Sequence, residues 1–416
     1  MQAEERTGGV NHPLSFRMGL IAFLTQSISF GCMFGSFGVL LESVELKLGI
    51  GREASTLAFP LVTLGSTLLA PVVGMLAGKF SLKRLMIIGT ILVSLGYALL
   101  GATHFYPLYL AAYGLFIGPG MCFSGQVPPS ILVTRWFTFK RGRALGFVHM
   151  PIMIAVLPVL VAFVLRDYGA NAVYFSLAAL IALTLIPISM IVDYPPSALD
   201  PTGEDQATEQ AVDPGQSSVQ LLRDVRFWVL TFATSAILAG QVMIVTHLVP
   251  MAKGWGLSDT TAASLLAANS FAGVAGTLLF GWLADKWGGR NTLIFACLDS
   301  IVLWIIMLFH PALPILGTVV VLIGLHGAAG LPMFGVAISE AFGKASFGRA
   351  FGMGTLGVLP FSVGAPPLAA AVFVRTGSYA DAIVVHLALF AIGAALLVFF
   401  GGRAAKIAAQ PASVPH

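Results

Sequence analysis

Amide and imidazole side chains interrupt several of the long apolar runs in this sequence. Gln26, Gln241 and His326 lie near the middle of such runs, and Gln126 lies closer to one end of another. Inside an apolar helix, polar groups of this kind are costly and usually face a cavity or a polar partner. Amides can hydrogen-bond a small polar solute, and histidine can change its charge near neutral pH. These residue types therefore favour solute binding and proton transfer.

Further polar residues lie in or beside apolar runs, namely His149, His247, Asn269, Thr277 and Asp299. His247 lies toward the outer end of its run, and Asp299 is the only acid well inside any of them. For Asp299 we expect structural pairing, with proton coupling as the alternative. For the amides and histidines, a satisfied contact between helices is the alternative to contact with a solute.

The sequence shows no metal-ligand spacing, phosphate-binding loop or catalytic triad, so we expect no enzymatic activity, no cofactor and no metal. Its three cysteines, Cys32, Cys122 and Cys297, lie in apolar stretches, and an odd number argues against a disulfide framework. The net charge of +4 could suggest nucleic acid in a soluble protein. Here the basic residues fall in short loops, which indicates a topology signal, and we expect no nucleic acid partner.

The chain has 416 residues, of which 57% are hydrophobic and only 10% are charged, and its mean hydropathy is +0.91. Soluble domains carry about 25% charged residues. So few charges could not cover a chain of this length in water, and we therefore expect an integral membrane protein. Twelve apolar runs reach the length of about 20 residues that a helix needs to cross the bilayer, without the alternation of a membrane barrel. The predicted spans are 16–42, 53–78, 85–104, 107–133, 142–165, 170–194, 224–252, 259–284, 291–310, 312–340, 348–375 and 379–402.

The distribution of lysine and arginine predicts the orientation of these spans. With a cytoplasmic N-terminus, 17 of the 22 basic residues fall in inner segments. We therefore expect a multi-pass protein of the cell inner (plasma) membrane with both termini in the cytoplasm. The stretch 195–222 has the composition of a mobile linker. The sequence thus predicts an all-α protein with two pseudo-symmetric six-helix bundles, 1–194 and 223–416, that form one transport unit.

A similar short turn follows the second and the eighth span. The two copies read Gly74-Met-Leu-Ala-Gly78-Lys-Phe-Ser-Leu-Lys83-Arg84 and Gly281-Trp-Leu-Ala-Asp285-Lys-Trp-Gly288-Gly-Arg290. A carboxylate at a helix end can accept from the free N–H groups of a neighbouring helix while an arginine clamps it. We interpret Asp285 with Arg290 as a clasp that holds the inner side closed, with ordinary loop charges as the alternative. Gly78 replaces the acid in the first copy, so we expect a weaker clasp there.

This turn resembles the signature loop of the major facilitator superfamily. A second motif, Arg135-Trp136-Phe137-Thr-Phe-Lys140-Arg141-Gly142-Arg143-Ala144-Leu-Gly146, is similar to a loop of monocarboxylate transporters and oxalate/formate antiporters. The stretches His247-Leu-Val-Pro250, Glu340-Ala-Phe-Gly343 and Thr376-Gly-Ser-Tyr379 resemble the same carriers. The resemblance implies that spans one, four, seven and ten line a central cavity. It also implies a gating role for charged residues of the cytoplasmic loops, which here are Arg135, Arg141, Arg143, Asp285, Arg290, Glu340 and Arg349.

One departure from these carriers concerns the solute. They commonly have an arginine in span eight, where this chain reads Gly276-Thr277-Leu-Leu-Phe-Gly281, so Thr277 stands in its place. An anion must then bind to neutral donors or find its charge partner elsewhere. Burial would favour neutral histidine, and an incoming carboxylate would favour the protonated form. We therefore take His326 as the first candidate for proton coupling and His149 as the second. Asp299 is the alternative candidate.

These observations predict a secondary active transporter of a small organic acid, or of a similarly small metabolite, that works as a monomer by alternating access. The candidate solute-binding residues are Gln26, Gln126, His149, Gln241, His247, Asn269, Thr277 and His326. An exporter of drug-like compounds is one alternative, although span five lacks the Gly-Pro-x-x-Gly-Gly run that such antiporters usually carry. A receptor or scaffold that does not transport is the other alternative.

Overall fold

The computed structural model describes residues 11–195 and 215–400 of the chain. Within these residues every regular element is a helix, as the sequence predicted. Residues 196–214 of the predicted linker and the last two residues of the twelfth predicted span lie outside this part. Ten described helical stretches are long and apolar enough to cross a membrane: Ser15–Leu48, Ala54–Leu76, Leu82–Ala102, Tyr106–Trp136, Arg141–Ser189, Val225–Gly254, Asp259–Trp287, Gly289–Leu308, Leu313–Thr376 and Ala380–Phe400.

Two of these stretches contain two crossings each. Arg141–Ser189 is interrupted at Gly169 and Leu313–Thr376 at Gly343, where φ is 79° and 73°. Residues with a side chain rarely adopt such angles. The 64 residues of Leu313–Thr376 would make about 95 Å of straight helix, against a hydrocarbon core about 30 Å thick. The ten stretches therefore supply the twelve predicted crossings.

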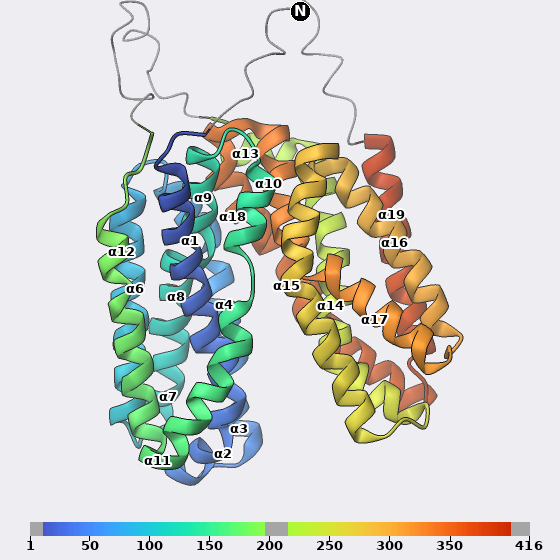
Figure 1. The fold of residues 1–416 in the computed structure, drawn as a ribbon, viewed down its shortest axis with the longest axis horizontal. Coiled ribbons are helices and arrows are strands. Elements are labelled where there is room, and N and C mark those ends of the chain that lie inside the picture. Colours follow the sequence, from blue (N-terminus) through green and yellow to red (C-terminus); the bar gives the residue numbers. More distant parts are fainter. Residues whose placement is uncertain (1–10, 196–214, 401–416) are drawn as a thin grey trace, which may run out of the picture. The chain divides into compact units, whose positions relative to one another are not determined.

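The described residues fall into two compact units. One is drawn from Met1–Gln216 and Phe342–Leu356, and the other from Ser217–Ala341 and Gly357–His416. The long helix α18 (Gly330–Thr376) therefore contributes to both. Within each unit the helices lie side by side (Figure 1).

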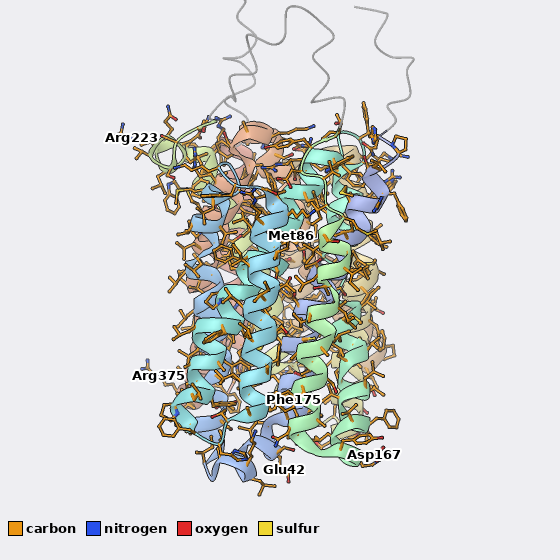
Figure 2. All side chains as sticks on the ribbon, turned by 90° about the vertical axis from the view of Figure 1, so that its left-hand side faces the viewer. Glu42, Met86, Asp167, Phe175, Arg223 and Arg375 are labelled. Atoms are coloured by element: carbon orange, nitrogen blue, oxygen red, sulfur yellow. The ribbon has the colours of Figure 1, made fainter. Side chains whose placement is uncertain are left out.

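The first unit consists of bundled helices whose ends are tied by polar contacts. They are α1 (Ser15–Phe30), η1 (Gly31–Gly35), α2 (Ser36–Leu48), α3 (Arg52–Thr56), α4 (Ala58–Leu68), α5 (Ala70–Leu76), α6 (Leu82–Ala102), α7 (Tyr106–Ala111), η2 (Ala112–Ile117), α8 (Gly118–Met121), η3 (Cys122–Gln126), α9 (Val127–Trp136), α10 (Arg141–Val148), α11 (Ile152–Leu183) and α12 (Leu185–Ser189). Figure 2 shows Glu42 and Asp167 at one end of this bundle and Met86 toward the other. Lys47 donates to the carbonyls of Leu100 and Gly101 at 2.9 and 3.2 Å, and so satisfies free acceptors at the end of α6.

Spans one and four of this unit contain π-helical segments. These are η1 in span one, and η2 and η3 in span four. Directly after η3, Pro128 and Pro129 remove two backbone donors, so the helix cannot keep its regular hydrogen-bond pattern there. Segments of this type are frequent at functional sites. In these segments the backbone hydrogen bonds depart from the regular α-helical pattern.

Two helices of the second unit pack in close contact. Its elements, besides the remainder of α18, are α13 (Ser218–Arg223), α14 (Val225–Gly254), α15 (Asp259–Trp287), α16 (Gly289–Leu308), α17 (Leu313–Gly327) and α19 (Ala380–Phe400). A side chain at Gly276 of α15 would collide with the backbone of Leu325, and one at Gly324 of α17 with the backbone of Asn269. Small residues let membrane helices approach this closely. Polar side chains of α15 can therefore reach the backbone of α17.

Candidate functional site

A half-buried amide, Gln241, and a buried one, Asn269, form a hydrogen-bonded pair in the second unit. The Nε2 atom of Gln241 donates to Oδ1 of Asn269 at 2.9 Å, and Nδ2 of Asn269 donates to the carbonyl of Val320 at 2.9 Å. Gln241 lies against the backbone of Gly327, where any side chain would collide with its amide. The Oε1 atom of Gln241 is buried and has no hydrogen-bond partner in the described chain. The pair thus ties α14, α15 and α17 together and leaves one acceptor free.

His326 is buried between polar groups of the neighbouring helix. Its side chain comes from α17, and the whole residue is 2% exposed. Its Nε2 atom lies 2.8 Å from Oγ of Ser300, and its Nδ1 atom lies 3.1 Å from Oδ2 of Asp299, both on α16. The ring of Phe280 on α15 packs edge-on against the imidazole, with centroids 6.0 Å apart. The structure thus brings together His326 and Asp299, two of the three residues that the sequence suggested for proton coupling.

His247 takes part in a separate cluster near the end of α14. Its Nε2 atom donates to the carbonyl of Pro366 at 3.0 Å, and its Nδ1 atom lies 3.3 Å from the hydroxyl of Tyr379. Thr277 is fully buried, and its hydroxyl donates to the carbonyl of Val274 at 3.0 Å. It directly follows Gly276, at which a side chain would collide with the backbone of Leu325.

The first unit carries the remaining candidates for solute binding. Gln26 on α1 is 5% exposed, and its Oε1 atom has no hydrogen-bond partner in the described chain. Gln126 ends η3, and its carbonyl accepts from the hydroxyl of Ser130 at 3.3 Å. The Nδ1 atom of His149 donates to the carbonyl of Leu145 at 2.9 Å, while its Nε2 atom lies 3.5 Å from Oγ of Ser130. His149 is therefore held mainly by its own helical turn.

A carboxylate that sequence reasoning missed holds the start of α6. The carboxylate of Asp193 accepts from the backbone N–H groups of Leu82 and Lys83 at 2.9 and 3.3 Å. Its Oδ2 atom lies 4.0 Å from Nη1 of Arg135, whose Nη2 atom donates to the carbonyl of Ala77 at 2.7 Å. The available signal was the missing acid in the first turn motif, together with an acid at the end of the sixth predicted span.

Another carboxylate caps a helix in the second unit. The Oε2 atom of Glu340 accepts from the backbone N–H of Gly289 at 2.9 Å, at the start of α16. Arg290 donates to the carbonyls of Leu397 and Val398 at 2.9 and 3.1 Å, at the end of α19. Asp285 lies near the end of α15. Arg290 thus donates hydrogen bonds to the end of α19, and Glu340 supplies the carboxylate that caps the start of α16.

The other predicted gating residues also make backbone contacts in the first unit or lie at its surface. Arg141 donates to the carbonyl of Phe137 at 3.1 Å, and Arg349 donates to the carbonyl of Gln216. Arg143 is an exposed residue of α10. In the described chain, no group of three or more His, Cys, Asp or Glu side chains could hold a metal ion.

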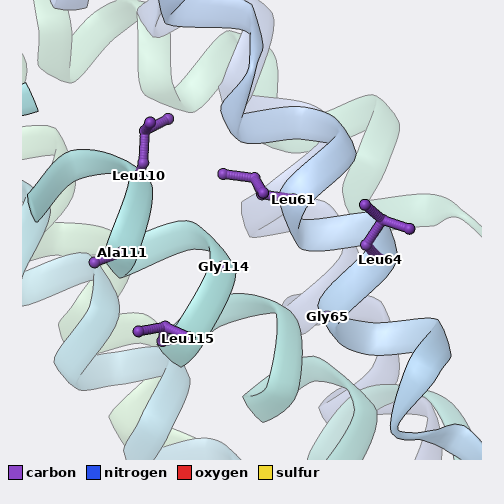
Figure 3. Close-up of a pocket in the computed structure, with 7 residues that line it drawn as sticks. All are labelled: Leu61, Leu64, Gly65, Leu110, Ala111, Gly114 and Leu115. Carbon is purple, nitrogen blue, oxygen red and sulfur yellow. The ribbon is translucent and has the colours of Figure 1, made fainter. Parts of the chain in front are cut away.

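An apolar groove of about 380 Å³ lies between α4 and the segment formed by α7 and η2 (Figure 3). Its lining residues are aliphatic or glycine: Leu61, Leu64, Gly65, Leu110, Ala111, Gly114 and Leu115. None of these side chains can hydrogen-bond a carboxyl group. The groove therefore does not compete with the polar clusters as a site for a polar solute.

Curated proteins similar to this chain include two named carriers of organic acids. The oxalate:formate antiporter of Oxalobacter formigenes is 25% identical over 280 residues, which cover 65% of this chain and 65% of that protein, slightly less than two thirds of its length. Monocarboxylate transporter 4 of Gallus gallus is 24% identical over 225 residues, covering 52% of this chain and 46% of that protein.

Solved structures share the fold. The E. coli fucose:proton symporter FucP superposes with a TM-score of 0.70 at 16% identity, covering 93% of this chain and 98% of that one. The human organic anion transporter MFSD10 gives a TM-score of 0.69 at 14% identity, covering 93% and 100%. The family model of the Major Facilitator Superfamily matches residues 22–298 and 230–415. With its twelve crossings, the chain is a multi-pass membrane protein and belongs to the Major Facilitator Superfamily.

Proposed function

We propose that this protein is a secondary active transporter that moves a small organic acid across the membrane by alternating access. Membership of the superfamily supports the general mechanism. The names of two relatives, an oxalate:formate antiporter and a monocarboxylate transporter, support the class of solute. We further propose that the protein lies in the plasma membrane as a monomer with both termini in the cytoplasm. Residues 1–194 and 223–416 are its two proposed repeats.

The observation that carries this proposal is the free acceptor of Gln241. Its Nε2 atom is committed to Asn269, while its Oε1 atom is buried without a partner. A buried acceptor without a donor is unfavourable by about 1–3 kcal/mol. A hydroxyl or a protonated carboxyl group of a solute can supply the missing donor. Gly327 keeps the amide in this place because a larger residue there would displace it.

The charges of the surrounding helices favour an acid that moves together with a proton. The basic residues of α14 and α15 are Arg226, Lys253 and Lys286, and all three lie at helix ends. Helix α17 contains neither lysine nor arginine. A carboxylate bound beside Gln241 would therefore lack a permanent positive charge from these helices. A proton taken up with the acid removes that cost.

Counterflow in proteoliposomes tests the proposed function. Vesicles preloaded with unlabelled formate, oxalate or lactate should exchange it for the radiolabelled acid outside, and methyl acetate, which has no hydrogen-bond donor, should compete poorly. Gln241→Leu keeps the approximate volume but removes the acceptor, and should raise the half-saturation concentration about tenfold, the equivalent of one hydrogen bond.

Thr318→Val is the matched control, because this exposed side chain of α17 bonds only to its own helix, at the carbonyl of Pro314. It should exchange acids like the unmodified protein. The proposal is wrong if the folded protein exchanges none of the three acids, or if Gln241→Leu binds them as well as the control does.

A further inference from the structure

Asn269 connects the amide of Gln241 to a fixed backbone group. The Nδ2 atom of Asn269 lies 2.9 Å from the carbonyl oxygen of Val320 on α17. A backbone carbonyl only accepts hydrogen bonds, and no rotation or protonation turns it into a donor. The amide of Asn269 must therefore direct its NH2 group toward Val320, which leaves its Oδ1 atom as an acceptor on the other side.

The orientation of Asn269 then fixes the orientation of Gln241. Oδ1 of Asn269 lies 2.9 Å from the amide of Gln241, and only the Nε2 atom of that amide can donate to it. If the Gln241 amide were turned end for end, two carbonyl oxygens would face each other at this distance. Neither amide ionises near neutral pH, so no proton can relieve such a contact. Gln241 therefore keeps Oε1 as its free end.

Close packing of α17 holds the acceptor that orients Asn269. Asn269 is fully buried, so water does not compete for its amide. Gly324 lies against the backbone of Asn269, and Gly327 lies against the amide of Gln241, so that a side chain at either glycine would collide. Small residues let membrane helices approach this closely. The carbonyl of Val320 lies on the same helix as both glycines and is thus kept at hydrogen-bond distance.

We propose that Asn269 is a positioning residue that makes Oε1 of Gln241 the acceptor for the solute, so that the site selects protonated carboxylic acids over carboxylates and esters. The proposal deepens the proposed function and rests on it for the contact between Gln241 and the solute. The hydroxyl of a protonated acid donates to Oε1, and its carbonyl can accept the second hydrogen of Nε2. A carboxylate can accept that hydrogen but leaves Oε1 without a donor.

Two neutral compounds test this selection. Acetamide has the shape of acetic acid and can donate to Oε1, whereas methyl acetate has only acceptors. Because neither compound is charged, their comparison does not depend on the ionisation of the competitor. Each compound is used to displace radiolabelled formate, oxalate and lactate from the purified protein in nanodiscs. With the unmodified protein, acetamide should compete at about tenfold lower concentration than methyl acetate, the equivalent of one hydrogen bond.

Two substitutions at Asn269 separate positioning from packing. Asn269→Leu keeps the branched shape of the side chain but removes both hydrogen bonds. The Gln241 amide can then turn and donate to methyl acetate, so this compound should gain and the two compounds should compete within about twofold of each other. Asn269→Asp accepts from Nε2 of Gln241 in either protonation state and should retain the tenfold ratio. A residue that only packs the helices would weaken both compounds equally and leave the ratio unchanged.

Two further variants complete the comparison. Gln241→Leu should also abolish the ratio, but through weaker competition by acetamide, because the acceptor itself is lost. Asn291→Leu is the matched control, since Asn291 is exposed and donates to the carbonyl of Trp287 at 2.9 Å. It should retain the ratio of the unmodified protein.

NMR keeps the inference testable if Asn269→Leu does not fold. In protein labelled at glutamine and asparagine, a contact between the Nε2 hydrogens of Gln241 and Cγ of Asn269 is expected, assigned with Gln241→Leu. Absence of this contact, equal competition by the two compounds in the unmodified protein, or an unchanged ratio in folded Asn269→Leu would overturn the inference. If the unmodified protein binds none of the acids, the proposed function is wrong, and the NMR contact still decides the orientation of Gln241.

Discussion

The Nδ1 atom of His247 lies 3.3 Å from the phenol oxygen of Tyr379. Because the Nε2 atom of His247 donates to the carbonyl of Pro366, Nδ1 is the acceptor and the phenol is the donor. Burial raises the pKa of Tyr379, so its hydroxyl remains protonated and able to donate. The ring of Tyr379 stacks on that of Phe373, with centroids 4.6 Å apart. These contacts fix α14 to the turn between α18 and α19.

Tyr379→Phe should remove the hydrogen bond to His247 and keep the stacking on Phe373. We expect the free energy of unfolding to fall by about 1 kcal/mol. Thermal unfolding of the purified protein in detergent measures the change. Tyr168→Phe is the control, since Tyr168 is 76% exposed and should give no change. Equal melting of the two variants would show that the contact does not stabilise the fold.

Asp193→Asn should weaken the start of α6. The neutral amide can accept fewer and weaker hydrogen bonds from Leu82 and Lys83 and loses its attraction to Arg135. We expect a loss of about 1–3 kcal/mol of stability, measured by chemical or thermal unfolding. Asp167→Asn removes an acid whose pairing with Arg166 is exposed to solvent, and it should leave the stability unchanged. A stable Asp193→Asn variant would argue against the cap.

Gly276→Ala should separate α15 from α17. The added methyl group would collide with the backbone of Leu325, which cannot rotate away as a side chain can. We expect a destabilisation of about 1–3 kcal/mol, together with slower acid exchange because Asn269, one member of the amide pair, lies on the same helix. Gly317→Ala is the control, since its methyl group would lie 3.8 Å from Leu265 in ordinary contact. Similar melting temperatures would contradict this account.

Asp285→Asn should damage turnover more than binding. The residue lies near the end of α15 in the second copy of the turn motif, away from the amide pair of Gln241 and Asn269. If its charge serves gate closure, the maximal rate in sealed vesicles should fall about tenfold with little change in half-saturation concentration. Asp259→Asn, at the exposed start of the same helix, is the control. Normal transport by Asp285→Asn would rule out the proposed clasp.

The number of crossings and the helical class could both be predicted from the sequence alone. Both depend on the length of apolar runs, which is a local property of the chain, because a helix satisfies its own backbone groups in lipid. Even the two merged stretches could be separated, since the glycines at 169 and 343 lie between predicted spans. The turn motifs were likewise sufficient to predict membership of the superfamily, which the family model confirms. Candidate polar residues could be found in the same way, by their position inside apolar runs.

Which of these polar residues contact one another depends on the packing of the helices and could not be predicted from the sequence. Asp299 and His326 lie on different helices, and the sequence indicated structural pairing of Asp299 without naming its partner. In the same way, the bonds of Arg290 to the carbonyls at the end of α19, over 100 residues away, could not be predicted from the sequence. The direction of a side chain is set by the rotation of its helix and by the helix packed against it. These depend on close contacts such as that of Gly276 with Leu325, which no local pattern of residues specifies.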